Sequence, residues 1–236
     1  LKPDDRYQFI FLTVRENQVE EALEDISKNK SPNVVTMINT IKPYGRWEKI
    51  CGKGRILPAF PGAGGCIEGG ILDAQLLPRA IQPTTFGEIG GRKSSREEAL
   101  AYIFRKSHIP YQIVPEMHHW QISHLGVIIP LADAYYQSRH PEKICANEKL
   151  MTLTAYRMKK NLKWIAQKGM LCPAKLYMIK DMPTGMLAGV LSRVYQSEFG
   201  NRFLYRHAMH APEEFQRLHQ EFYNYMKTHT KESNKA

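Results

Sequence analysis

The sequence predicts an α/β fold in which a parallel sheet with crossover helices, extending to about residue 115, precedes an all-helical part. In the first part, apolar β-branched runs of strand length alternate with segments of helical periodicity, and no strand signal follows Pro115. The chain has 236 residues, of which 43% are hydrophobic and 24% are charged. This composition is sufficient for a folded core and too apolar for a disordered chain.

The first elements predict the parallel sheet. Residues 7–14 (YQFIFLTV) form a nearly continuous apolar run, which is typical of a strand covered on both faces. A helix is predicted over residues 17–27, a second strand at 33–38, a helix around 44–51 and a third strand at 55–60. A succession of strand, helix, strand, helix and strand at this spacing favours parallel pairing with right-handed crossovers.

Glycine clusters mark the next segment. Between residues 61 and 92 they separate short apolar pieces, which predicts strands joined by tight turns. The cluster PGAGG begins this segment, but strand-like sequence follows it rather than a helix, so we interpret its glycines as turn residues and not as a phosphate loop. Ser94 or Ser95 is expected to cap a helix, and a last strand is predicted at residues 111–114.

The remainder is predicted to be helical. Residues 118–138 are apolar enough for a buried helix, which we expect to be kinked at Pro130. An amphipathic helix is predicted over residues 148–167, and a final helix begins at Pro212. The polar end, residues 231–236, is expected to fray.

Charge and cysteine content limit the classes of partner and compartment. The formal net charge of +10 favours an anionic partner. Lysines and arginines between residues 149 and 180, with Tyr156 and Trp164 on the same helix, are interpreted as a solvated helix face rather than a nucleic-acid surface. No apolar run is long enough for a membrane helix, and no signal peptide is recognised. Four scattered cysteines without a CxxC pair indicate a reducing, cytoplasmic environment.

A few polar residues are placed where chemistry is expected. Ligands of parallel sheets bind beyond the carboxyl ends of the strands, where Arg15 and Gln18 follow the first strand and Asn39 follows the second. An arginine and two amides in these places could bind a phosphate or a polar ligand. On the residues alone, a solvated arginine, a helix cap and a turn asparagine are the favoured interpretation. His124 lies in the most apolar helix and is either a core residue or a site residue. The histidine spacings do not indicate a metal site.

The combination of FLTVRENQVEEAL, VVTMIN, FPGAGG and QPTTFGEIGG, followed by MHHWQISHLGVIIPLADAYY and KGMLCP, resembles the ketopantoate reductase (2-dehydropantoate 2-reductase) family. The match runs in order along nearly the whole chain and is closer to uncharacterised bacterial members than to biosynthetic ones. The resemblance implies an NADPH-dependent reductase of a 2-keto acid. It also implies a Rossmann-type dinucleotide-binding domain, here residues 1–115, and a helical domain, here residues 116–236.

The resemblance also implies roles for particular residues. Arg15 stands at the position of a basic residue near cofactor and substrate, and Gln18 matches a cofactor-contacting glutamine. Asn39 matches the asparagine near the nicotinamide, although Thr40 stands where the family has glycine. The family's catalytic lysine position is Ile122, which cannot donate a proton, so His124 is considered as a substitute.

The chain contains no GxGxxG motif, and we therefore expect it to be a truncated form that lacks the family's first strand and phosphate-binding turn. Two hypotheses follow. The intact protein is an NADP-dependent reductase of a small 2-keto acid, or it is a catalytically impaired or non-catalytic relative that binds a ligand or dimerises. A homodimer that covers the exposed sheet edge through the helical half is a further hypothesis.

Overall fold

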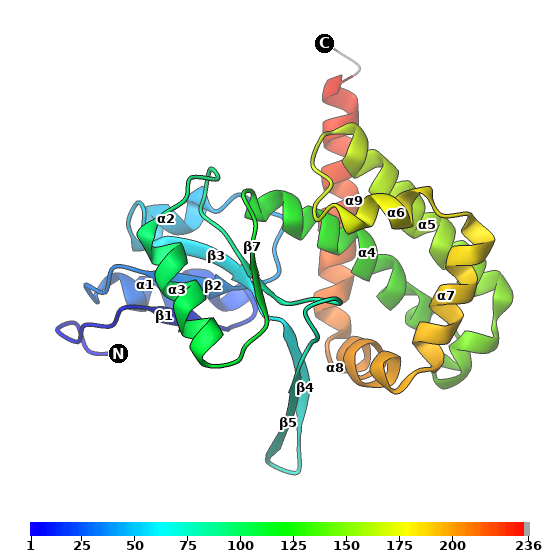
Figure 1. The fold of residues 1–236 in the computed structure, drawn as a ribbon, viewed down its shortest axis with the longest axis horizontal. Coiled ribbons are helices and arrows are strands. Elements are labelled where there is room, and N and C mark those ends of the chain that lie inside the picture. Colours follow the sequence, from blue (N-terminus) through cyan, green and yellow to red (C-terminus); the bar gives the residue numbers. More distant parts are fainter. Residues whose placement is uncertain (234–236) are drawn as a thin grey trace. The chain divides into compact units, whose positions relative to one another are not determined.

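The structure, a computed structural model, describes residues 1–233 (Figure 1). The chain forms two compact units. The first contains residues 1–63 and 75–118, and the second contains residues 64–74 together with the chain from residue 119 onward. The second unit therefore includes an internal segment that the sequence-based division placed in the first domain.

The first unit contains a five-stranded sheet in the order β1 (Ile10–Leu12), β2 (Val34–Met37), β3 (Ile56–Phe60), β6 (Thr84–Phe86) and β7 (Tyr111–Ile113). The pairs β1–β2, β2–β3 and β6–β7 are parallel, which confirms the predicted α/β class. The pair β3–β6 is antiparallel, with Ala59 opposite Phe86. No crossover helix separates these two strands, so the chain returns in the opposite direction.

Four helical segments accompany this sheet: the 3₁₀ turn η1 (Glu16–Gln18), α1 (Val19–Ser27), α2 (Gly45–Cys51) and α3 (Ser95–Lys106). Helices α1 and α2 lie on one face of the sheet and α3 on the other (Figure 1). Leu100 and Phe104 of α3 pack against Leu57 and Phe86 of the sheet in a fully apolar cluster. The sheet is therefore covered on both faces, as doubly wound folds require.

The first strand differs from its prediction. Only Ile10–Leu12 pair as β1, and β1 pairs with β2 alone among the described residues, at an edge of the sheet. Phe11 is 43% exposed and Tyr7 is 44% exposed, so the expected coverage of this run on both faces was wrong. An apolar run predicts burial only where neighbouring elements are present to cover it.

The internal segment of the second unit is a hairpin of β4 (Ala63–Glu68) and β5 (Ile71–Leu76). Its turn is Gly69–Gly70, with φ of +57° and +78°. Two successive positive φ angles are the requirement of the tight hairpin turn that glycine pairs favour. The predicted strands of this segment are thus present, and the EGG cluster supplies the turn. Gly64 and Gly65 of the PGAGG cluster lie within β4, so their interpretation as turn residues was wrong.

The rest of the second unit is helical, as predicted. Its elements are α4 (Met117–Gln137), the 3₁₀ segment η2 (Pro141–Ala146), α5 (Glu148–Gln167), α6 (Lys175–Asp181), α7 (Thr184–Gln196), the π-helix η3 (Gly200–Tyr205), α8 (Arg206–His210) and α9 (Pro212–Ser233). Helix α9 continues to Ser233, and residues 234–236 of the segment expected to fray lie outside the described residues. Within the described residues, no helix is both long and apolar enough to cross a bilayer.

Helix α4 continues through Pro130 without a break. A proline has no N–H, so the carbonyl of Gly126, four residues earlier, loses its helical partner. Asn161 of α5 donates a hydrogen bond from Nδ2 to this carbonyl oxygen at 3.2 Å. The absence of a side chain at Gly126 makes room for Ile165, whose Cδ1 would lie 2.7 Å from an added Cβ. A side chain from α5 thus completes the backbone hydrogen bonding of α4.

Candidate functional site

The residues that follow β1 and β2 meet at one edge of the sheet in the first unit. Leu12 pairs with Thr36, so the two parallel strands end side by side. Arg15 and Gln18 follow β1, and Asn39 follows β2. The structure therefore brings these three predicted site residues to the carboxyl edge of the sheet, where ligands of open parallel sheets bind.

Asn39 has an unusual environment. Its side chain is half-buried, and its Oδ1 atom is buried without a hydrogen-bond donor in the described part of the chain. A buried amide oxygen without a partner is costly, and in native proteins it commonly faces a water, an ion or a ligand. Asn39 Oδ1 is therefore an acceptor available to a bound group.

Arg15 and Gln18 are exposed. The backbone N–H of Arg15 donates to Gln18 Oε1 at 3.2 Å, so one end of the Gln18 amide caps the η1 turn. The exposed guanidinium of Arg15 keeps the planar donor geometry that suits a phosphate or carboxylate. Gln18 was interpreted either as a ligand-binding amide or as a helix cap, and the structure shows that its Oε1 is part of a local cap.

Sequence reasoning missed a buried charge cluster at the same edge. Glu16 is only 6% exposed, and its Oε1 lies 2.5 Å from Arg46 Nη2 and 3.2 Å from Lys42 Nζ. The backbone N–H of Lys42 donates to Thr40 Oγ1 at 3.1 Å. These contacts fix the loop that carries Asn39 against the turn that carries Arg15. Sequence periodicity does not reveal them, because Glu16 lies in η1, Lys42 in the loop after β2 and Arg46 in α2.

The charges of this cluster explain the ionisation of Glu16. Burial alone would raise the pKa of Glu16, but the hydrogen bond from Arg46 and the charges of Lys42 and Arg46 outweigh it and hold the pKa below its ordinary value. Glu16 is thus a carboxylate that anchors two cations. Both cations lie beside the loop of Asn39, which makes this edge favourable for an anionic ligand.

His124 lies in the second unit, on α4. Its imidazole stacks on Trp120, with ring centroids 5.0 Å apart and planes 7° apart. Burial, and to a lesser extent the nearby imidazole of His207, lower the pKa of His124 to about 3. His124 is therefore neutral at physiological pH and carries an N–H on only one ring nitrogen.

Ile122, at the position where the resemblance implies a lysine, is fully buried. It faces the core of the second unit, whereas His124, two residues later, is only partly buried. The two positions therefore differ in environment as well as in chemistry. His124 does not occupy the place of the missing side chain.

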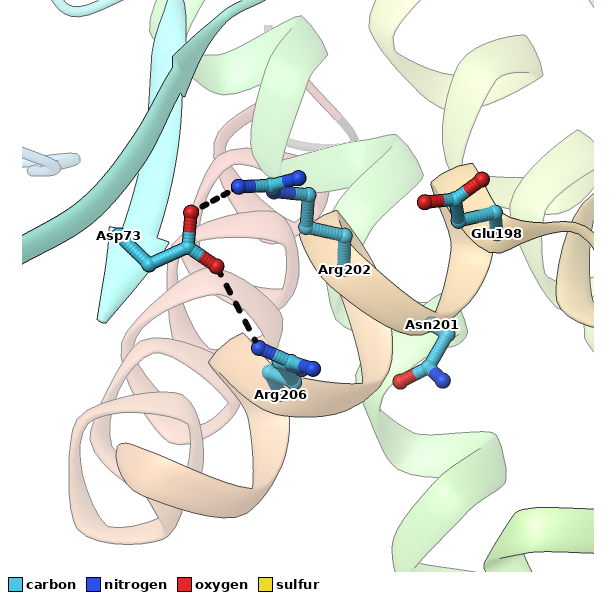
Figure 2. Close-up of a pocket in the computed structure, with 5 residues that line it drawn as sticks. All are labelled: Asp73, Glu198, Asn201, Arg202 and Arg206. Carbon is cyan, nitrogen blue, oxygen red and sulfur yellow. Dashed lines mark hydrogen bonds and ion pairs between the residues drawn. The ribbon is translucent and has the colours of Figure 1, made fainter. Parts of the chain in front are cut away.

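A small polar pocket lies between the hairpin and η3 in the second unit (Figure 2). Arg202 donates from Nη2 to Asp73 Oδ1, and Arg206 Nη1 lies 3.7 Å from Asp73 Oδ2. Glu198 and Asn201 complete the lining. Two of the lining residues, Asn201 and Arg202, lie in the π-helix η3. No element was predicted for residues 198–206, because a π-helix has no periodicity signal of its own.

No metal centre is found within the described residues, because no three histidine, cysteine or acidic side chains gather there. The ring of His118 is engaged with the backbone, since its Nε2 lies 2.8 Å from the carbonyl oxygen of Ile41. Arg15, Gln18 and Asn39 thus share one edge of the first unit, while His124 lies in the second unit.

No protein-family model matches the chain, and no curated protein matches it in sequence. Solved structures do match. A 2-dehydropantoate 2-reductase from Geobacter metallireducens is similar with a TM-score of 0.59 and 15% identity, over 93% of this chain and 77% of that one. A dimeric ketopantoate reductase from Staphylococcus aureus is similar with a TM-score of 0.58 and 11% identity, over 95% and 78%.

A D-mandelate dehydrogenase, solved with NADH and anilino(oxo)acetate, is similar with a TM-score of 0.50 and 13% identity, over 97% of this chain and 78% of that one. At such identities the likeness concerns the fold. It agrees with the sheet order and the helical second unit described above. The chain therefore has the fold of the ketopantoate reductases, a Rossmann-type sheet domain with an α-helical domain after it.

Proposed function

We propose that the protein is a reductase that transfers a hydride from NADPH to the ketone of a small 2-keto acid. The observation that carries this proposal is the buried, unpartnered Oδ1 of Asn39 at the carboxyl edge of the parallel strands. Similar solved structures include a ketopantoate reductase and a D-mandelate dehydrogenase bound to NADH, and both names imply chemistry between a hydroxyl and a ketone. That shared fold and that acceptor together favour a nicotinamide cofactor.

The residues at this edge fit such a cofactor. Asn39 Oδ1 would accept a hydrogen bond from the carboxamide or from a ribose hydroxyl, and Arg15 would pair with a phosphate. The free amide donors of Gln18 would contact the cofactor from the η1 turn, since only Oε1 is engaged by the cap. The cofactor supplies the hydride. The cluster of Glu16, Lys42 and Arg46 would hold the Asn39 loop in position.

His124 is proposed to act as a neutral hydrogen-bond donor to the ketone oxygen. With a pKa of about 3 it carries no extra proton at pH 7 and is a poor proton source. A neutral imidazole can still polarise a carbonyl through its N–H. Asn39 would assist by orienting the reacting groups. The proton for the alkoxide would then come from solvent.

The test is the affinity of the intact protein for NADPH, measured by isothermal titration calorimetry. Asn39→Ala removes the acceptor and is expected to weaken binding about tenfold, the effect of one hydrogen bond to a buried polar group. Asn224→Ala, an exposed asparagine of α9, is the matched control and is expected to bind as the wild type does. Absence of NADPH binding by the wild type, or equal affinity of both variants, would contradict the proposal. NADH in parallel tests the assignment of NADP.

A second candidate function is a non-catalytic relative that binds the cofactor or dimerises. The burial of Ile122 favours it, since no protonated side chain replaces the lysine of the family. NADPH that binds but is not oxidised with any small 2-keto acid would support this alternative. Sedimentation velocity tests the homodimer, for which the dimeric enzyme of the same fold is the precedent.

A further inference from the structure

Two arginines of the second unit face one carboxylate. Arg202 lies in η3 and Arg206 begins α8, four residues later, so both side chains project from the same side of a helical turn. Figure 2 shows both guanidinium groups directed at Asp73 of the hairpin. Arg202 donates to Asp73 Oδ1, and Arg206 Nη1 is 3.7 Å from Asp73 Oδ2.

Asp73 leaves one donor of Arg202 unused. A guanidinium has five N–H groups, and the contact of Arg202 with Asp73 engages only its Nη2. The Nε of Arg202 is buried and has no acceptor among the residues that the structure describes. A second or better-placed oxyanion would satisfy this donor, which Asp73 leaves unused.

The contact is accessible to solvent and can be exchanged. The side chain of Asp73 is 45% exposed and that of Arg202 is 28% exposed. Asp73 sits on a hairpin that touches η3 at a second point, where Gly64 leaves room for the ring of Phe203. The hairpin would therefore stay in contact with η3 if the carboxylate of Asp73 were displaced.

The η3 segment also approaches a proposed catalytic group. His207 follows Arg206 directly, and its imidazole contributes to the low pKa of His124. Tyr136 of α4 donates from Oη to the carbonyl oxygen of Ala208 at 2.7 Å. The arginines therefore belong to a segment that packs along α4, the helix of His124.

We propose that Arg202 and Arg206 form a binding site for the carboxylate of a small organic acid, and that Asp73 occupies this site as an internal substitute when the ligand is absent. This inference rests on the proposed function, because the carboxylate of a 2-keto acid is the ligand that this function requires. A planar carboxylate matches the fork of a guanidinium in two parallel hydrogen bonds. The ligand competes with Asp73, so the hairpin lowers the affinity of the arginine pair for the ligand.

The experiment is an NMR titration of the full chain with 2-oxobutanoate, without cofactor, following the arginine Nε–H resonances. D73N removes the competing charge and is expected to bind 2-oxobutanoate about tenfold more tightly than the wild type, which corresponds to about 1.4 kcal/mol. R202Q is expected to bind 2-oxobutanoate about tenfold more weakly than the wild type, or weaker still. R193Q, an exposed arginine of α7, is the matched control and is expected to bind as the wild type does. The uncharged 2-oxobutanamide is expected to bind weakly to all four proteins.

Equal affinity of R202Q and R193Q would overturn the site, and a folded D73N without a gain in affinity would overturn the competition by Asp73. If D73N does not fold, as its melting curve would show, R202Q and R202K decide. R202K keeps the charge but not the fork, and an affinity equal to that of the wild type would contradict a carboxylate site. Because no cofactor is present, failure here leaves the NADPH titration of Asn39→Ala unaffected, and failure of that titration leaves this result unaffected.

Discussion

At the scale of single residues, positions 122 and 124 show how little a sequence resemblance says about the environment of a side chain. Ile122 is fully buried in the second unit, and His124 stacks on Trp120. Replacing a lost general acid at position 122 would therefore introduce a charge into a core rather than into an open site. His124 lies on a different side of α4 from Ile122, so the two side chains have different surroundings.

Ile122→Lys is expected to lower the free energy of unfolding by about 3–5 kcal/mol, the cost of an uncompensated buried charge. Ile122→Leu conserves volume and is expected to cost less than about 1.5 kcal/mol. Urea denaturation at pH 7 measures both. A Lys variant as stable as the wild type would show that position 122 reaches solvent or a charged partner.

The lowered pKa of His124 predicts that the folded protein loses stability in mild acid. Its folded-state pKa of about 3 lies below its ordinary value of 6.5, so the unfolded chain binds the proton first as the pH falls. Stability is therefore complete above about pH 6.5 and declines toward pH 3, by up to about 2 kcal/mol between pH 6.5 and 5. Thermal unfolding from pH 7 to 5 measures the effect.

His124→Gln is expected to flatten this dependence. The matched control is His140→Gln, because the imidazole of His140 is 76% exposed. The stability of this variant should depend on pH as that of the wild type does. If His124→Gln loses as much stability as the wild type between pH 7 and 5, His124 does not carry the effect.

Only those residues of the candidate site whose place follows from the end of a strand could be predicted from the sequence. Asn39 follows a strong strand signal, and the rule about strand ends placed it correctly at the edge. The contacts of Glu16 with Lys42 and Arg46 were not predicted, because these residues are 26 and 30 positions away from Glu16 in the chain. The pair of Arg202 and Arg206 was missed for the same reason, since its carboxylate is 129 residues away from Arg202.

At the scale of elements, the best predictions rested on local chemistry. Ser94 was one of two candidates for the cap of α3; its Oγ accepts from the Glu97 N–H, and the Ser94 N–H donates back to the Glu97 carboxylate, each at 3.2 Å. By contrast, α6 has seven residues and was not predicted. Isolated helices of that length are marginal, so packing against α5 rather than local propensity determines it.

Helix α4 offers an element-scale test. Asn161→Leu leaves the Gly126 carbonyl without a donor beside Pro130, and we expect it to cost about 1–3 kcal/mol of unfolding free energy. Gln167→Leu, an exposed change on the same helix α5, is the control and should alter stability by less than about 0.5 kcal/mol. Denaturant titration compares them. Equal stability of the two variants would show that water replaces Asn161 at the carbonyl.

At the scale of the whole molecule, the succession of a sheet part and a helical part was predictable. The packing of the β4–β5 hairpin with the second unit was not. Alternation of strand and helix signals predicted the sheet unit, and helical periodicity over residues 118–138, over residues 148–167 and from Pro212 onward predicted the second unit. Nothing in residues 64–74 indicates that they pack with helices far along the chain. Their partners, Phe203 and the pair of Arg202 and Arg206, become neighbours only through tertiary structure.

The backbone consequently passes between the two units three times, after residues 63, 74 and 118. A cut in the Gly69–Gly70 turn would leave β3 and β4 on one fragment and their partners β6 and β5 on the other. Each sheet would then span both fragments, and we expect a protein nicked at an inserted protease site to migrate as one species in native mass spectrometry. Fragments that separate without denaturant would refute this. The same connectivity makes the hairpin tip a natural position for new termini in a circular permutant.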